Sequence, residues 1–230
     1  IDLNVCLQPY HASYMNITGE LMRDTAVMYA RREAFISDDQ RLPQLLPEDV
    51  EPLYNENGER VRKLRVGYLS SDLGNHPVGR NMLGVMIAHN KDNFEWYCFS
   101  TKQIQGDPVQ STMAQHCEWV DISLKANHAA VAKMIRDDYK IDVLIDLNGW
   151  TAYRRLQVFA ARPAPIQMTH GLGFVGTVGA KDCFDFFITD AVASPPRFDS
   201  YYTENLVRVE QAYLPAAHKK VHITAEGADF

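Results

Sequence analysis

Several features that mark whole classes of proteins are missing from this sequence of 230 residues. It contains no run of about 18 apolar residues, which is the length that a membrane-spanning helix needs, so we expect no membrane span. Its first residues lack the basic, apolar and small-residue layout of a secretory signal. The three-glycine dinucleotide fingerprint and the Walker A pattern are also missing, which removes the two most recognisable phosphate-binding loops.

Cysteine is scarce, and the four cysteines are scattered. Cys6, Cys98, Cys117 and Cys183 form no C-x-x-C pair, so neither a zinc site nor a disulfide framework is expected. We predict no metal site of any kind. Reduced, half-buried thiols suit a soluble, intracellular protein, located in the cytoplasm, the nucleus or an organelle.

A basic excess is missing as well. The chain carries 23 Lys and Arg against 29 Asp and Glu, a formal net charge of −6. Binding to nucleic-acid phosphates depends on clustered cations that displace counterions. Nucleic acid is therefore not an expected partner.

What is present divides into two parts, and the first covers residues 1–61. Apolar residues recur at roughly helical spacing over residues 12–36, which predicts a helix. Three prolines and many charges follow, which is typical of an extended surface linker. We expect the apolar helical positions to be packing contacts rather than a ligand-binding box: Met15, Leu21, Met22, Ala26, Met28, Tyr29 and Phe35.

From residue 62 onward, short apolar strands alternate with amphipathic helices. Strands are predicted near residues 63–71, 94–101, 119–122, 141–147, 184–190 and 205–209. Helices are predicted over residues 79–90, from residue 110 toward the strand at 119, and over 127–140, where Asn127 is a plausible N-cap. Nearly continuous apolar strands indicate a sheet buried on both faces. The predicted fold is α/β: a Rossmann-like parallel sheet covered by helices, with a helical N-terminal extension.

Three polar loops follow predicted strands. They are "SSDLGNHP" at 70–77, "DLNGWT" at 146–151 and "TDAVASPP" at 189–196. In open parallel sheets, ligands bind outside the carboxyl ends of the strands. The loops therefore predict a site at one edge of one sheet.

His76 is the most attractive candidate in these loops, since imidazole can accept a proton or hydrogen-bond a sugar or phosphate oxygen near neutral pH. The alternative is a histidine that only caps a backbone group. Asp72 either orients His76 or caps the next helix, and Trp150 either stacks on a sugar ring or fills a hydrophobic gap. The glycine-rich segment 171–180 either brings backbone N–H groups close to a ligand or is a flexible loop.

A resemblance to a known family rests on seven segments that occur in this order: "LRVGYLSSDLGNHPV", "FEWYCFS", "IDVLIDLNGWT", "ARPAPIQ", "LGFVGTVGA", "FDFFITDAVASPP" and "YYTENLVRV". Together they resemble the N-terminal catalytic lobe of the protein O-linked N-acetylglucosamine transferase family, over about residues 62 to 215. "RPAPIQ" before the L-G-F-x-G-T loop, downstream of "GNHP" and "DLNGWT", is the specific part.

The resemblance implies one lobe of a GT-B glycosyltransferase with an inverting, metal-independent reaction. The family transfers N-acetylglucosamine from UDP-GlcNAc to Ser or Thr hydroxyls of proteins, and relatives of similar fold use GDP-fucose. It implies no cofactor beyond the nucleotide-sugar donor. The expected partners are protein substrates or subunits of a larger complex. The resemblance divides the chain into a helical extension and linker (1–61), like those that connect tetratricopeptide repeats to the catalytic region, and a catalytic lobe (62–230).

The resemblance also assigns site residues. His76 matches the histidine beside the donor's sugar and phosphates, and is the expected catalytic residue. The expected donor- or cleft-binding residues are Asn148, Gly149, Thr151, Leu172, Gly173, Gly176 and Thr177.

The chain also departs from the family pattern. Arg80, Tyr153 and Val175 stand where the family has histidine, a small residue and proline, and "MTHG" before Leu172 is one residue longer. The second, nucleotide-binding lobe of the family is not in this sequence, so we expect the chain alone to be inactive. The alternative function is a non-catalytic scaffold or subunit that keeps the lobe as an interaction surface.

Overall fold

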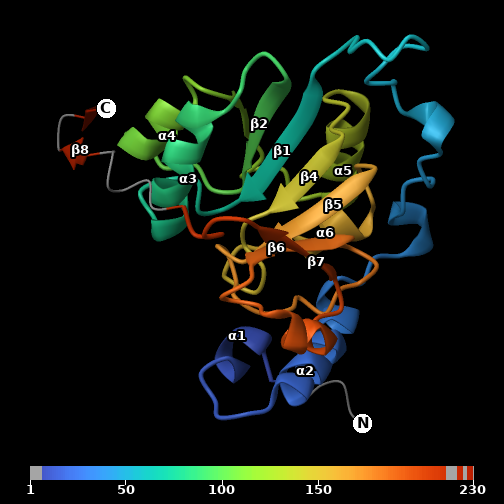
Figure 1. Ribbon diagram of the computed structural model, residues 1–230, viewed down its shortest axis with the longest axis vertical. Coiled ribbons are helices and arrows are strands. Elements are labelled where there is room, and N and C mark those ends of the chain that lie inside the picture. Colours follow the sequence, from blue (N-terminus) through green and yellow to red (C-terminus); the bar gives the residue numbers. More distant parts are fainter. Residues whose placement is uncertain (1–6, 216–221, 225–226, 230) are drawn as a thin grey trace.

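The computed structural model describes residues 7–215, 222–224 and 227–229, and its centre is a seven-stranded sheet with the strand order β3-β2-β1-β4-β5-β6-β7 (Figure 1). Every neighbouring pair of strands is parallel. The strands are β1 (Leu64–Ser70), β2 (Phe94–Ser100), β3 (Glu118–Asp121), β4 (Val143–Asp146), β5 (Ile166–His170), β6 (Phe186–Asp190) and β7 (Asn205–Val209). A separate antiparallel pair, β8 (His222–Thr224) and β9 (Gly227–Asp229), lies near the carboxyl terminus. The predicted α/β parallel sheet is confirmed.

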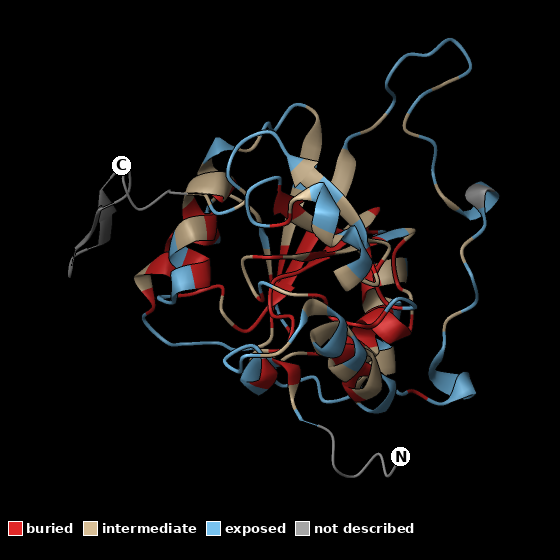
Figure 2. Cartoon of the chain, turned by 60° about the horizontal axis from the view of Figure 1, so that its bottom comes forward, coloured by how far each residue is buried: buried red, intermediate tan, exposed pale blue. Residues whose placement is uncertain are grey.

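Helices cover both faces of the sheet, because successive side chains of a strand point to opposite faces. Tyr68 of β1 packs with α3 (Pro77–Ala88) and α4 (Pro108–Met113) on one face. Leu69 packs with α5 (His128–Asp137) and α6 (Leu156–Ala160) on the other. Figure 2 shows the buried residues concentrated in the sheet and in the helix sides that face it. Asn127 caps α5 as predicted, since its Oδ1 accepts the N–H of Ala130 at 3.0 Å.

The N-terminal extension is two helices rather than the single helix predicted over residues 12–36. They are α1 (Pro9–Ala12) and α2 (Gly19–Glu33). The Thr18 side chain accepts the Leu21 N–H at 3.3 Å and so begins α2, because a capping hydroxyl competes with continued helix. Among the predicted packing positions, Ala26 and Tyr29 are buried and Met22 packs against the core, whereas Met15, Leu21 and Phe35 are exposed.

An exposed connector joins α2 to β1 and contains two short 3-10 helices, η1 (Asp38–Gln40) and η2 (Pro47–Asp49). Most of it is exposed in Figure 2, as the prolines and charges predicted. In Figure 1 it leaves the helices at the bottom and returns along the right-hand side to the amino end of β1. The extension therefore reaches both ends of the strands.

The strand β5 and the helix α6 were not predicted. Two prolines favour an extended backbone over residues 162–167, and β5 begins directly after Pro165, between β4 and β6. Its Gln167 and Thr169 are buried polar residues, so no apolar alternation marked the strand. The Nε2 of Gln167 donates to the carbonyls of Phe159 and Cys183.

Candidate functional site

The loops after β1, β4 and β6 lie at one side of the sheet, here called the carboxyl edge, because all seven strands run in the same direction. The expectation that these loops share an edge is confirmed. The opposite side, where the strands begin, is called the amino edge.

Asn148 joins the loop after β4 to the loop after β1. Its Oδ1 accepts the backbone N–H of Ser71 at 3.0 Å, and its Nδ2 donates to the Ser71 hydroxyl at 2.9 Å. The same Nδ2 lies 3.0 Å from Thr151 Oγ1 and 3.3 Å from Asp72 Oδ2. Asn148 is fully buried. Its amide therefore fixes the shape of the edge.

Asp72 lies between Asn148 and His76. Its Oδ2 is 3.9 Å from His76 Nδ1, and its Oδ1 accepts the Ser71 hydroxyl at 3.0 Å. The Asp72 side chain is 18% exposed and that of His76 is 49% exposed. A half-exposed imidazole beside a shielded carboxylate can exchange protons with a bound substrate.

His76 also performs the structural role that the sequence left open. It is the N-cap of α3, and its Nδ1 accepts the N–H of Val78 at 3.3 Å. In a neutral ring this leaves the hydrogen on Nε2. Asp72 therefore is not the helix cap.

Asp146, the last residue of β4, stabilises the loop that follows this strand. Its carboxylate accepts the backbone N–H groups of Asn148 at 3.1 Å and Gly149 at 2.7 Å, and the Thr169 hydroxyl at 3.2 Å. Burial raises the pKa of Asp146 to about 6, although the N–H donors oppose the rise. At neutral pH the ionised carboxylate fixes the turn that presents Asn148.

The glycine-rich segment packs tightly on this turn. Gly149 has φ of +53°, and a Cβ there would lie 2.4 Å from the Cβ of Phe174. A Cβ on Gly173 would lie 2.2 Å from the carbonyl oxygen of Leu147. These glycines allow two loops to approach one another, which is a different reason for glycine than approach to a ligand.

The remaining predicted site residues divide between the edge and the interior. Thr177 is buried, and its hydroxyl donates to Glu204 Oε2 at 2.7 Å, so the hydroxyl is engaged within the chain. Burial raises the pKa of Glu204. Leu172 packs against the core on the α3 side. Gly176 lines a groove of about 270 Å³ between the extension and the glycine-rich segment, with Met15, Ile17, Met22, Phe174 and Val175 also in its wall.

The extension is docked onto the loop after β4. The ring of Trp150 is fully buried and meets the ring of Tyr29 edge-on, with centroids 5.0 Å apart. Arg154 donates to Glu33 Oε2 at 2.9 Å. Trp150 therefore fills a hydrophobic gap and cannot stack on a sugar.

Sequence reasoning assigned no firm role to Asp72 and did not single out Asp146 or Glu204. The signal for Asp72 was its place four residues before His76 in one polar loop. No signal in the sequence separates Asp146, at the end of an apolar strand, from an ordinary strand-terminal acid. Its three donors come from residues brought together only by the fold.

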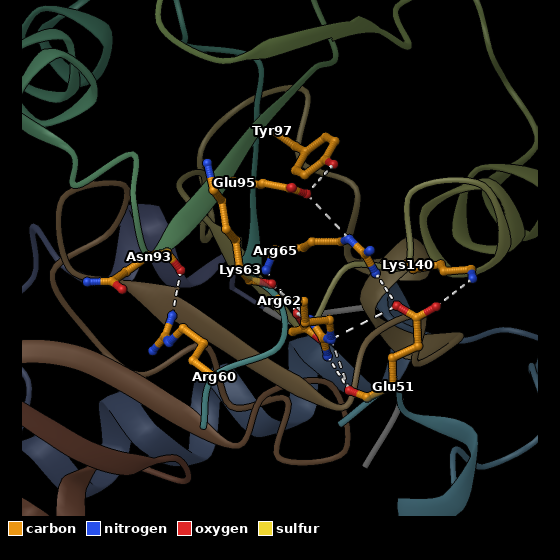
Figure 3. A network of polar contacts seen from close by, with 10 residues as sticks. Glu51, Arg60, Arg62, Lys63, Arg65, Asn93, Glu95, Tyr97 and Lys140 are labelled. Atoms are coloured by element: carbon orange, nitrogen blue, oxygen red, sulfur yellow. Dashed lines mark hydrogen bonds and ion pairs between the residues drawn. The ribbon is translucent and has the colours of Figure 1, made fainter. Parts of the chain in front are cut away.

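A larger groove, about 390 Å³, lies at the amino edge, and five charged residues of its wall form ion pairs with one another: Glu51, Arg62, Arg65, Lys140 and Asp142. Figure 3 shows Glu51 of the connector between Arg65 and Lys140. The Glu51 carboxylate lies 2.9 Å from Arg65 Nη1 and 3.0 Å from Lys140 Nζ, and these cations lower its pKa to about 2. Arg62 forms a two-pronged pair with Asp142. This network ties the connector to the sheet.

Among residues 7–215, 222–224 and 227–229, no helix combines the length and apolarity needed to cross a bilayer. The same residues contain no group of three or more His, Cys, Asp or Glu side chains placed to hold a metal ion. Cys6 lies outside the described residues.

Comparison with known proteins identifies a family. The model of glycosyl transferase family 41 matches residues 44–226. The chain is 34% identical over 215 residues to a probable UDP-N-acetylglucosamine–peptide N-acetylglucosaminyltransferase SEC of Arabidopsis thaliana, covering 93% of this chain and 21% of that protein. A UDP-N-acetylglucosamine–peptide N-acetylglucosaminyltransferase of Caenorhabditis elegans is 36% identical over 173 residues, covering 74% of this chain and 14% of the relative.

A solved structure agrees with these matches. A mutant of the Thermobaculum terrenum O-GlcNAc transferase superposes with a TM-score of 0.76 at 31% identity, covering 90% of this chain and 37% of that one. The chain thus spans about a fifth or less of the two curated relatives described above.

Proposed function

This chain belongs to glycosyl transferase family 41, and we propose that residues 62–230 form the N-terminal catalytic lobe of a protein O-GlcNAc transferase. In this proposal the lobe contributes to transfer of N-acetylglucosamine from UDP-GlcNAc to Ser or Thr hydroxyls, and residues 1–61 are a helical extension and linker. The observation that carries the proposal is the contact chain from His76 through Asp72 to Asn148 at the carboxyl edge. Two of the relatives are named for the same transfer.

The reaction needs a proton acceptor and stabilisation of a leaving group. The acceptor oxygen forms a bond to the anomeric carbon while the bond from that carbon to the UDP oxygen breaks. His76 is half exposed and, while Nδ1 accepts the Val78 N–H, its Nε2 hydrogen can be donated to a donor oxygen. To receive the hydroxyl proton at Nε2, the ring must carry its hydrogen on Nδ1 instead and give up the bond to Val78. Asp72 orients the ring in that second form, because its Oδ2 lies 3.9 Å from Nδ1 and faces the hydrogen that Nδ1 then carries.

The part of the carboxyl edge on which the sugar would rest is shaped by Asn148, Gly149 and Gly173. Both polar atoms of the Asn148 amide form hydrogen bonds within the chain. Asn148 therefore shapes the carboxyl edge rather than binding the donor through its side chain. The charge that develops on the diphosphate requires cations or N–H donors aimed at it. We assign that task to a second lobe, which in this proposal faces the carboxyl edge.

Transfer by the complete gene product tests the proposal. Radiolabelled UDP-GlcNAc and GDP-fucose are supplied separately with a mixture of Ser- and Thr-containing peptides. Label on peptide from UDP-GlcNAc supports the proposal, label from GDP-fucose changes the donor, and no label from either contradicts transferase function. The same assay with the 230-residue chain alone is expected to show no transfer.

A non-catalytic lobe is the second candidate. The Thr177 hydroxyl, expected near the donor, is engaged by Glu204 within the chain, and Tyr153 stands at the carboxyl edge where the family has a small residue. This candidate predicts no heat of UDP binding to the complete protein by calorimetry. Micromolar UDP binding would contradict it.

The partners and location follow from the same proposal. We expect protein substrates, or partner subunits in a larger assembly, rather than nucleic acid, and an intracellular site of action. Fractionation of cells that express the complete protein, followed by isolation of bound proteins, tests both expectations.

A further inference from the structure

A tyrosine occupies a backbone conformation that normally favours glycine. Tyr153 has φ of +58° and is 69% exposed. For a bulky residue the left-handed region is unfavourable, and such residues persist only where the surrounding structure imposes the conformation. They gather at functional sites, so the surroundings of Tyr153 are informative.

Three loops fix the backbone on both sides of this residue. The carbonyl of Ala152 accepts the Ser71 hydroxyl at 3.2 Å and Asn148 Nδ2 at 3.3 Å. The carbonyl of Tyr153 lies 3.4 Å from Thr101 Oγ1. The loops after β1, β2 and β4 therefore hold Tyr153 at the carboxyl edge. The Ser71 hydroxyl that bonds Ala152 also bonds Asp72, so this position is close to the proposed catalytic cluster.

A lysine lies over the tyrosine ring. Lys102 Nζ is 5.6 Å from the Tyr153 ring centroid, within the range of a cation–π contact. The Lys102 carbonyl accepts the Ser100 hydroxyl at 2.7 Å and Gln110 Nε2 at 3.0 Å, so its backbone is held in place. Within the described residues, Lys102 forms no ion pair with a carboxylate. The carboxyl edge thus presents an aromatic ring and an ammonium group that no carboxylate of the described residues neutralises.

We propose that Tyr153 and Lys102 bind the acceptor polypeptide and favour an acidic side chain next to the modified Ser or Thr. The aromatic face packs against the peptide, and the ammonium group pairs with the acidic side chain. The inference rests on the proposed function and adds a specificity for it. A small residue at position 153 would offer no such surface.

The chain contains a matched control at the opposite edge. Tyr54 is 51% exposed, and the guanidinium carbon of Arg60 lies 5.5 Å from its ring centroid. Arg60 also donates to the carbonyl of Asn93, just before β2, which places the pair at the amino edge. The chemistry is closely similar and only the location differs.

The test uses the complete protein and four variants: Tyr153→Gly, Lys102→Glu, Tyr54→Gly and Arg60→Glu. Binding is measured on an array of Ser and Thr peptides with acidic or basic neighbours, and transfer from UDP-GlcNAc is measured on the same peptides. Glycine suits the left-handed conformation, so Tyr153→Gly should fold, which its melting temperature checks.

We expect Tyr153→Gly to raise KM for acidic peptides about tenfold, the loss of one well-placed aromatic contact, while KM for UDP-GlcNAc stays within about twofold. Lys102→Glu should shift the preference from acidic to basic peptides. The two amino-edge variants should behave like the wild type.

Each other outcome has a definite meaning. A wild-type protein that transfers sugar while both carboxyl-edge variants keep its peptide preference overturns the inference alone. A raised KM for UDP-GlcNAc instead of peptide also overturns it, because the ring would then contact the donor. If the wild type transfers nothing, the proposed function fails. Peptide binding that still depends on Tyr153 and Lys102 would then support the part of the inference that this surface binds peptide.

Discussion

The side-chain amide of Asn148 hydrogen-bonds both the backbone N–H and the hydroxyl of Ser71, a residue 77 positions earlier in the chain. This one pair of contacts joins the loop that carries Asp72 and His76 to the loop that carries Gly149 and Thr151. Because β1 and β4 are adjacent parallel strands, the two loops end at the same level. The candidate site depends on this junction.

Asn148→Ala should destabilise the protein by about 1–3 kcal/mol, because the buried N–H of Ser71 loses its acceptor. Urea unfolding measures the change. Asn205→Ala is the control, since the exposed Asn205 side chain bonds only the Asp185 carbonyl, and it should cost less than about 0.5 kcal/mol. Equal effects of the two substitutions would contradict the importance of the junction.

Asp146→Asn should destabilise the turn below Asn148. An amide can present only one acceptor oxygen, so its NH₂ group would face one of the N–H donors of Asn148 or Gly149. We expect a loss of about 1–3 kcal/mol in the free energy of unfolding and faster hydrogen exchange in residues 146–152. Unchanged exchange in these residues would show that the carboxylate does not hold the turn.

Gly149→Ala should be much more harmful than Gly58→Ala. Both glycines have positive φ, so both substitutions carry the same kind of backbone strain. A Cβ at position 149 meets Phe174, whereas a Cβ at position 58 has nothing within 4 Å. The melting temperature of the two variants separates the steric contribution, and similar values would refute the close packing of the two loops.

The strands of the fold were largely predictable and the way the site is built was not. β1, β2 and β4 are short apolar runs that the sequence shows directly, and the polar loops after β1, β4 and β6 predicted the site at the carboxyl edge. β5 was missed because Gln167 and Thr169 are polar, so the strand shows no apolar alternation. Both side chains are buried and hydrogen-bond residues that the fold brings next to them. The start of α2 is marked by the Thr18 cap, which the apolar spacing over residues 12–36 did not show.

The roles of the candidate site residues were also only partly predictable from the sequence. His76 was identified from its loop, but its capping role and its distance to Asp72 come only from the folded structure. Thr177 is an expected donor-binding residue, and its bond to Glu204, 27 residues later in the chain, comes only from the folded structure. Contacts of that span leave no periodic trace in a sequence.

Stability should depend on His170 below neutral pH. Burial lowers the pKa of His170 to about 4 from its ordinary value of 6.5, so the unfolded chain binds a proton between these values while the folded protein does not. The free energy of unfolding therefore falls as pH drops from about 6.5 to about 4, by up to about 3 kcal/mol from this residue. His170→Asn retains an acceptor for the Leu172 N–H and removes the titrating ring. It should flatten this part of the pH profile, and an unchanged slope would show that other groups cause it.

Glu51→Gln should loosen the connector at the amino edge. The pKa of Glu51 is lowered to about 2, so its ion pairs with Arg65 and Lys140 stabilise the fold at neutral pH and are lost as pH falls from about 4.5 toward 2. We expect faster proteolysis of residues 41–62 in the variant, with a smaller difference at high salt. Glu56→Gln, at an exposed position of the same connector, is the control and should resemble the wild type. Equal cleavage of all three proteins would mean that the network does not hold the connector.

The central claim, that His76 takes part in sugar transfer, is tested most directly by His76→Asn in the complete protein. Asparagine is a good N-cap, so α3 should remain formed, while the imidazole is removed. We predict that kcat/KM for transfer from UDP-GlcNAc falls by about 10²-fold or more with an unchanged melting temperature, whereas His116→Ala, near the amino end of β3, transfers at the wild-type rate. Transfer by His76→Asn at the wild-type rate would contradict the claim.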